Sequence, residues 1–235
     1  MFNRWHPQLA LRYLPIVRYI KNSGLVNPSI LEVGSGSLGI GPYLKKEFTG
    51  ADIEFSGPKW PQMKQVKASA KTLPFADNIF DIVISVDTLE HIPPPSRQLV
   101  VNEIIRTATK QVIIAVPVGK NSQAQDRDLN QEYIRRYGKS FTFLTEHVTY
   151  GLPESQAVSG WINAAAKKYH KNIRITQIGN RNLSLRLWLM RGWMTKNQLI
   201  DIFFRKILLF FLPILQFLDH RPPYYRQVYF VKISP

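Results

Sequence analysis

Two nearly continuous apolar runs constrain the fold of this chain more than any other feature. They occupy Phe80–Val86 and Gln111–Val116 and are rich in valine and isoleucine. Runs of this kind are typical of strands that are buried on both faces of a parallel sheet. The segment between them, Arg97–Thr109, has its apolar residues at helical spacing. A strand, a helix and a second strand in this order predict a right-handed crossover within an α/β domain.

The N-terminal third of the chain continues the same alternation. An amphipathic helix is predicted over Pro7–Asn22, and short strands are predicted at Ser29–Val33, Phe48–Ile53 and Gln65–Ala68. The whole pattern predicts a doubly wound, Rossmann-like α/β fold. Open sheets of this class bind their ligands at the carboxyl ends of the strands.

A glycine-rich loop follows the first predicted strand. Gly34, Gly36 and Gly39 fit the pattern G-x-G-x-x-G, in which glycines let the backbone turn sharply and approach a ligand closely. A helix predicted over Gly41–Glu47 would point its N-terminus at that ligand. The pattern alone indicates a nucleotide or a nucleoside without distinguishing between them.

Two carboxylates narrow the choice. Asp52 ends the second predicted strand and can accept hydrogen bonds from both hydroxyls of a ribose, which NAD and S-adenosylmethionine (SAM) share. Glu32 lies two residues before Gly34, where it can hold the glycine loop. An acid there would repel a pyrophosphate but would counter the ammonium and sulfonium of SAM. The pair therefore favours SAM over NAD.

At this point the sequence resembles the class I SAM-dependent methyltransferases, most closely the small type 11 group. The resemblance covers residues 28–119 and rests on four segments: Glu32–Gly39, Gly50–Asp52, Leu73–Phe75 and Phe80–His91. It implies a mostly parallel seven-stranded sheet with an antiparallel final strand, and SAM as the cofactor.

The resemblance also implies which residues hold the cofactor. They are Glu32, Gly34, Ser35, Gly36, Asp52, Ile53, Ser69, Ala70, Val86 and Asp87. The glycine loop would line the methionine part, Asp52 would hold the ribose, and Ile53 would lie against the adenine. The backbone at Val86 and Asp87 would meet the amino-acid end.

The sequence departs from the family pattern in two places. Ser69 stands near the position where many members have an acid that binds the adenine amino group, which weakens or alters that contact. The prolines in Ser56–Pro61 predict a loop where the family has a helix. Trp60 in this loop either lies near the adenine or simply packs within the loop.

Methyl transfer needs alignment of the reacting groups more than side-chain chemistry. His91 follows the fourth strand on the ligand-binding edge, and we expect it to act as a base or to orient the acceptor. The alternative is a residue that packs at a helix start before Pro93–Pro95. Glu90 has the same two interpretations. Glu146 and His147 are adjacent and lie either in an acceptor lid or in a surface loop.

The chain has no cysteine, which excludes disulfides, thiolate zinc sites and cysteine nucleophiles. Its five histidines lie far apart, and no pair of them has the spacing of metal ligands. We therefore expect no metal site.

Charge is concentrated near the C-terminus. The chain carries a net charge of +15, and residues 160–235 contain 13 basic and only 2 acidic residues. Such a segment attracts an anionic partner, either a lipid surface, a nucleic acid or an acidic substrate, unless it only aids solubility.

An apolar insertion lies in the same basic region, over residues 180–222, and we expect it to be helical. Its most apolar part, 199–218, is interrupted by charges and is too short to span a bilayer. It is buried on the domain, docks at a membrane interface, or forms a dimer contact.

These observations predict a single methyltransferase domain over residues 1–235, with a cofactor core at 28–119, an acceptor lid at 120–152 and the helical insertion at 180–222. The favoured function is SAM-dependent methylation of a small or lipid-linked acceptor at a membrane surface. The alternatives are an RNA methyltransferase and a cofactor-binding module without activity. The N-terminal residues lack the apolar core of a signal peptide, so we expect a cytoplasmic protein that is either free or membrane-associated. The oligomeric state stays open.

Overall fold

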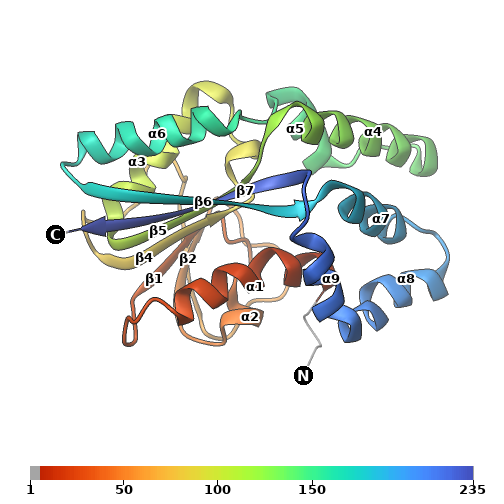
Figure 1. The fold of residues 1–235 in the computed structure, drawn as a ribbon, viewed down its shortest axis with the longest axis horizontal. Helices are drawn as coiled ribbons and strands as arrows, with labels where there is room; N and C mark the ends of the chain where they lie inside the picture. The colour runs from red at the N-terminus through yellow and green to blue at the C-terminus, as the bar shows by residue number, and fades with distance from the viewer. Residues whose placement is uncertain (1–5, 235) are drawn as a thin grey trace.

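A computed structural model describes residues 6–234 as a seven-stranded sheet with helices on both faces (Figure 1). The strand order is β3-β2-β1-β4-β5-β7-β6. The strands are β1 (Ile30–Val33), β2 (Phe48–Asp52), β3 (Met63–Lys67), β4 (Phe80–Val86), β5 (Ala108–Pro117), β6 (Asn172–Asn182) and β7 (Tyr224–Ser234). The pairs among β1 to β5 are parallel, and β7 runs antiparallel to both β5 and β6. The predicted fold class is confirmed.

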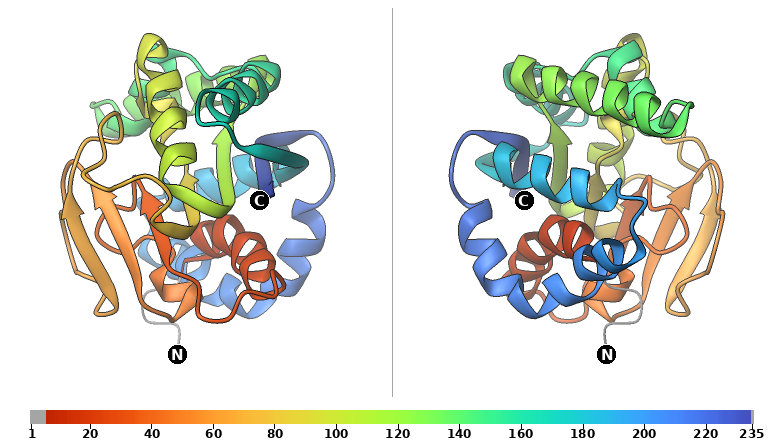
Figure 2. Two further views of the ribbon diagram at one scale, coloured as in Figure 1. Left: turned by 90° about the vertical axis from the view of Figure 1, so that its left-hand side faces the viewer. Right: turned by 90° about the vertical axis from the view of Figure 1, so that its right-hand side faces the viewer.

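Helices cover the sheet on two sides (Figures 1 and 2). The helical elements are α1 (Pro7–Lys21), α2 (Gly41–Leu44), η1 (Leu89–His91), η2 (Pro94–Ser96), α3 (Arg97–Thr107), α4 (Gly119–Tyr137), α5 (Thr142–Tyr150), α6 (Ser155–Lys168), α7 (Leu183–Trp193), α8 (Gln198–Arg205), η3 (Ile207–Phe211) and α9 (Leu212–Asp219). Helices α3 and α6 pack together over one face, and α1 with α9 lies over the other.

The core divides into two layers because successive strand residues point to opposite faces. On β4, Ile82 and Ile84 belong to the layer under α1, whereas Val83 belongs to the layer under α3 and α6. All three are fully buried. This burial on both faces explains why the run is almost continuously apolar in the sequence.

The helices differ from the sequence-based expectations in length rather than in kind. Helix α2 is a single turn that ends at Leu44, not at Glu47, because Lys45 adopts a left-handed conformation with φ of 56°. Helix α4, Gly119–Tyr137, occupies most of the region predicted as an acceptor lid, 120–152. The expected lid or surface loop after it contains the regular helix α5. Residues 56–61 contain no helix, as the two prolines predicted.

The insertion between β6 and β7 consists of α7, α8, η3 and α9. Figure 1 shows α7 and α8 at the end of the molecule toward which the parallel strands run. No helix of the described residues is long and apolar enough to cross a membrane. Of the N-terminal residues on which the signal-peptide argument rests, 1–5 lie outside the described part of the chain.

Candidate functional site

The glycine loop leaves β1 with a backbone that only glycine adopts readily. Gly34, Gly36 and Gly39 have φ angles of 77°, 53° and 48°, in the left-handed region that disfavours other residues. A Cβ on Gly34 would also overlap the side chain of Thr88, which follows β4. The loop is therefore pressed against the end of the neighbouring strand, and Gly36, which has open space around its Cα, faces outward.

Glu32 holds this loop from behind. Its fully buried carboxylate accepts hydrogen bonds from the Ile40 backbone N–H at 2.7 Å and from the Tyr13 hydroxyl at 2.9 Å. Burial raises the pKa of Glu32 to about 7, although both hydrogen bonds oppose the shift. The predicted role in holding the loop is confirmed. Its predicted second role, to counter the positive charges of the ligand, stays a prediction.

Asp52 ties the end of β2 to the same loop. Its Oδ2 accepts a hydrogen bond from the Gly36 N–H at 2.7 Å, and its Oδ1 accepts one from the Glu54 N–H at 3.2 Å. The next residue, Ile53, is 67% exposed. A carboxylate and an exposed apolar side chain thus lie together beside the glycine loop, as a ribose and an adenine would require.

The loops after β2 and β3 complete this edge. Ser69 pairs with Thr72 in an isolated bridge, and its hydroxyl accepts a hydrogen bond from Lys71 N–H at 3.3 Å. Ala70 packs partly against the core beneath it. The Trp60 ring lies against Gly41, and its backbone N–H donates to Ser37. Trp60 therefore supports the glycine loop from outside, which favours the loop-packing interpretation.

The end of β4 is an ionic junction that sequence reasoning missed. Asp87 follows the buried Val86 in a left-handed conformation, and its carboxylate binds Arg12 of α1 at 2.8 Å and Arg226 of β7. Burial by itself would raise the pKa of Asp87, but the two guanidinium groups hold it at about 2. No sequence signal links these residues, because Arg226 lies 139 positions after Asp87.

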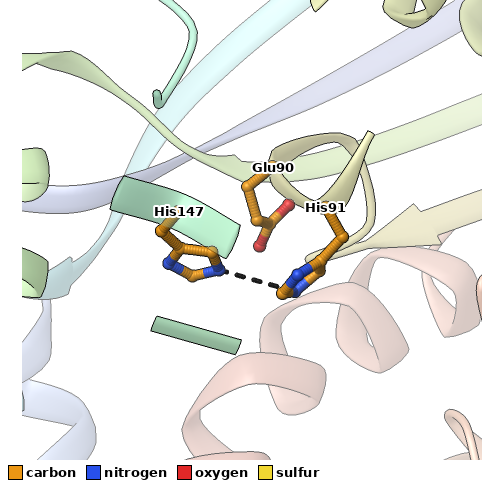
Figure 3. A group of neighbouring side chains, drawn as sticks. All are labelled: Glu90, His91 and His147. Atoms are coloured by element: carbon orange, nitrogen blue, oxygen red, sulfur yellow. Dashed lines mark hydrogen bonds between the residues drawn. The ribbon is translucent and has the colours of Figure 1, made fainter. Parts of the chain in front are cut away.

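His91 meets the helix α5 across this edge. Its Nδ1 lies 2.6 Å from a Glu146 carboxylate oxygen, and its Nε2 lies 3.4 Å from Nε2 of His147 (Figure 3). Burial, and then the neighbouring His147, lowers the pKa of His91. The structure therefore brings together His91, Glu146 and His147, which the sequence placed in separate segments.

A second group of residues anchors His147, and the sequence did not single it out. Asp126 of α4 binds Nδ1 of His147 at 2.7 Å. The same carboxylate binds Arg186 of α7 at 2.5 Å and accepts a hydrogen bond from Tyr225 at 2.8 Å. The only sequence signal for this group is that its members are polar. Asp126 meets residues from three distant segments, which no local pattern indicates.

Glu90, adjacent to His91, is fully buried. Within residues 6–234, no other residue donates a hydrogen bond to either of its carboxylate oxygens. Burial, and then the charge of Asp87, raises the pKa of Glu90 well above its usual range.

Comparison with known proteins shows which family of domains the residues at this edge resemble. Residues 31–116 match the family model described as a methyltransferase domain. Residues 31–116 therefore carry a methyltransferase domain. The match covers a little over a third of the chain and includes the glycine loop, Asp52, Asp87 and His91. No curated protein sequence matches the chain.

Solved methyltransferases share the fold across almost the whole chain. The plantazolicin methyltransferase BpumL, solved in complex with S-adenosylhomocysteine (SAH), is 11% identical with a TM-score of 0.57, over 99% of this chain and 87% of that one. A SAM-dependent methyltransferase from Thermotoga maritima is 15% identical with a TM-score of 0.53, over 100% and 95%. The methyltransferase domain of bacterial CtHen1-C is 16% identical with a TM-score of 0.53, over 97% and 99%. At such identities the likeness shows a common fold.

Proposed function

We propose that this protein transfers the methyl group of SAM to a lipid-linked acceptor at an anionic membrane surface. The cofactor part rests on the methyltransferase domain and on the glycine loop, in which a Cβ at Gly36 would project into open space. Gly34 to Gly36 would hold the methionine part and Asp52 the ribose. SAM supplies a methyl group activated by its sulfonium, and the protein aligns this group with the acceptor and excludes water.

The observation that carries the acceptor proposal is an outward apolar face on the insertion. Ten of the eighteen exposed large apolar residues in the described chain lie within residues 199–218. They are Leu199, Ile200, Ile202, Phe203, Ile207, Phe210, Phe211, Ile214, Phe217 and Leu218, and we call them the insertion face. Apolar patches of this extent mark interaction surfaces in soluble proteins.

Helix α8 turns its apolar side toward the solvent. None of its residues is buried. Leu199, Ile202 and Phe203 point outward at the spacing of one helical face. Its polar pair, Asp201 and Arg205, is joined by an ion pair of 2.5 Å and is less exposed than these apolar residues. A surface helix usually turns its apolar side to the core and its polar side to the solvent, and α8 does the reverse.

Basic residues flank the insertion face. Lys196, Lys206 and Arg221 are exposed, and the Arg221 guanidinium lies 4.8 Å from the centre of the Phe217 ring. Each basic residue close to an anionic bilayer contributes about 1 kcal/mol of attraction. Apolar groups beside cations complement acyl chains beside anionic headgroups, so we assign the face to a lipid surface rather than to a second copy of the chain.

The insertion face is linked to the candidate site through one helix. Helix α9 packs on α1, and Arg12 of α1 binds Asp87 at the end of β4. A lipid-linked acceptor held at the bilayer would therefore lie at the same end of the molecule as the glycine loop (Figure 1).

RNA as the acceptor is less well supported. Nucleic-acid binding needs accessible cations along the phosphate path. Three arginines of the basic C-terminal region, Arg181, Arg186 and Arg226, are buried, and Arg186 and Arg226 form close internal ion pairs. The accessible charge is accordingly smaller than the sequence suggests.

The test is sedimentation with vesicles that contain 30% anionic phospholipid, compared with neutral vesicles. We expect the wild type to bind the anionic vesicles, and the double variant Phe210→Ser/Phe217→Ser to lose at least tenfold in partition, because these rings are 75% and 62% exposed. The control is Val26→Ser/Ile79→Ser, which removes exposed apolar residues from the opposite edge of the sheet.

Two results would overturn the lipid assignment. One is equal partition of the wild type and the insertion-face variant. The other is a dimer in size-exclusion chromatography that Phe210→Ser/Phe217→Ser dissociates, which would assign the face to a second copy. RNA capture that is unaffected by the variant and abolished by salt would favour the RNA alternative.

A further inference from the structure

We propose that Glu90, His91 and His147 bind a divalent transition-metal cation. One ligand atom from each residue lies within 4.8 Å of those of the other two. Glu90 and His91 come from η1, directly after β4, and His147 comes from α5 (Figure 3). Two imidazoles and one carboxylate form a donor set that is common in sites for zinc and related metals.

The protonation pattern of the two histidines supports a cation between them. Nδ1 of His91 faces Glu146 and Nδ1 of His147 faces Asp126, at 2.6 and 2.7 Å. A carboxylate accepts hydrogen bonds, so in a neutral imidazole the proton lies on Nδ1. Both Nε2 atoms then carry lone pairs, and these lone pairs face each other across 3.4 Å. Two acceptors at this distance repel each other unless a proton or a metal cation lies between them, and a metal cation would also use the nearby Glu90 carboxylate.

Glu90 would supply the third ligand and a negative charge to balance the cation. Its side chain is fully buried and receives no hydrogen bond from another residue of the described chain. A buried carboxylate without a partner is costly, and a coordinated metal ion is one of the few groups that offset the cost. The unpartnered oxygens of Glu90 lie beside the two Nε2 atoms, so all three donors converge on one place (Figure 3).

The spacing also agrees with metal geometry. Two nitrogen ligands at about 2.0–2.1 Å from a tetrahedral cation lie roughly 3.3 Å from each other. The Nε2 atoms of His91 and His147 are already at 3.4 Å. The Glu90 oxygen, which lies within 4.8 Å of both histidine ligand atoms, would move inward to close the set.

The surrounding residues resemble the outer layer of a metal site. Asp126, which orients His147, is itself held by Arg186 and Tyr225. Carboxylates that bind the second nitrogen of a histidine ligand fix its tautomer and raise its basicity. In a metal site, Asp126 and its partners would fix the tautomer and orientation of His147.

Three protein ligands leave a coordination position open. That position lies at the carboxyl end of β4, beside the edge that would hold SAM, so the cation would bind and orient an oxygen of the methyl acceptor. This role depends on the proposed function, whereas binding of the cation does not.

The experiment is titration of the full chain, without a polyhistidine tag, with Co²⁺ followed by its visible absorption, and with Zn²⁺, Mn²⁺ and Mg²⁺ followed by calorimetry. We expect one equivalent of Co²⁺ or Zn²⁺ to bind, and Mg²⁺ to bind much more weakly because imidazole suits it poorly. Glu90→Gln and His91→Ala should each weaken Co²⁺ binding at least tenfold. Glu146→Gln, which changes only the support of His91, should weaken it about tenfold.

The matched control is His170→Ala, which removes a histidine from the turn that follows α6 and should leave binding unchanged. Circular dichroism of each variant separates loss of a ligand from loss of the fold. Absence of a stoichiometric Co²⁺ or Zn²⁺ site in the wild type would overturn the proposal. So would a site that survives in a folded Glu90→Gln/His91→Ala double variant. SAH binding, measured on the same samples without metal, tells failure of the metal site from failure of the methyltransferase assignment.

Discussion

The cofactor core, residues 28–119, and the remainder of the chain, residues 120–234, assemble their functional groups in different ways. In the core, Glu32 binds Ile40 and Asp52 binds Gly36, over 8 and 16 positions. Residues of the second region instead reach back to the first: His147 meets His91 over 56 positions, and Arg226 meets Asp87 over 139. Local contacts leave a readable motif in the sequence, whereas distant contacts do not. The sequence could therefore indicate the local contacts around the glycine loop, but not which distant segments meet His91 and Asp87.

The largest expected effect concerns the junction of the two regions. Asp87→Asn would leave the buried Arg226 and the partly buried Arg12 without the carboxylate that both of them bind. Breaking a buried ion pair in this way costs about 3–5 kcal/mol, and we expect such a loss in the free energy of unfolding by urea. Asp77→Asn, which breaks an exposed pair with Arg106 inside the first region, should cost less than about 1 kcal/mol. Equal losses would show that the junction does not join the regions energetically.

A pH-dependent effect is expected within the core. The pKa of Glu32 rises from 4.5 to about 7 on folding, so the folded state binds a proton more tightly. Its contribution to stability is complete below pH 4.5, falls as the pH rises through the pKa of about 7, and is constant above it. The total loss is about 3 kcal/mol.

Glu32→Gln removes this titration. The difference in unfolding free energy between the variant and the wild type should therefore change by about 3 kcal/mol between pH 4.5 and 7. Urea unfolding at several pH values measures it. Parallel profiles for the two proteins would refute the assignment of Glu32 as a buried acid with a raised pKa.

The smallest expected effect concerns ligand binding in the core. Asp52→Ala removes the acceptor proposed for the ribose hydroxyls and should weaken SAH about 30- to 100-fold, as expected for a lost hydrogen-bonded charge. Isothermal titration measures the change. The control is Glu54→Ala. Glu54 contacts Asp52 through its backbone N–H, so this variant removes a nearby carboxylate and keeps that contact. NAD binding to the wild type, or equal SAH affinity in both variants, would contradict the proposed cofactor site.

The insertion is the region whose arrangement could least be predicted from its sequence pattern. The apolar content of residues 199–218 left three arrangements open, and the structure buries Leu208, Leu209, Leu212 and Leu215 while turning the insertion face outward. An amphipathic pattern tells which residues share a face of a helix. It does not tell whether that face meets the core or the solvent, because this depends on which neighbour covers it.

The sequence by itself determined the strands, the crossover helix, the glycine loop and the position of Asp52. These features depend on neighbouring residues, since burial on both faces requires apolar runs and a left-handed turn requires glycine. Only the tertiary structure decided that Glu90, His91 and His147 converge, that Asp87 lies between two arginines, and that α8 exposes its apolar side. These arrangements join segments that are far apart in the chain, and no local pattern records which distant segment will become the partner.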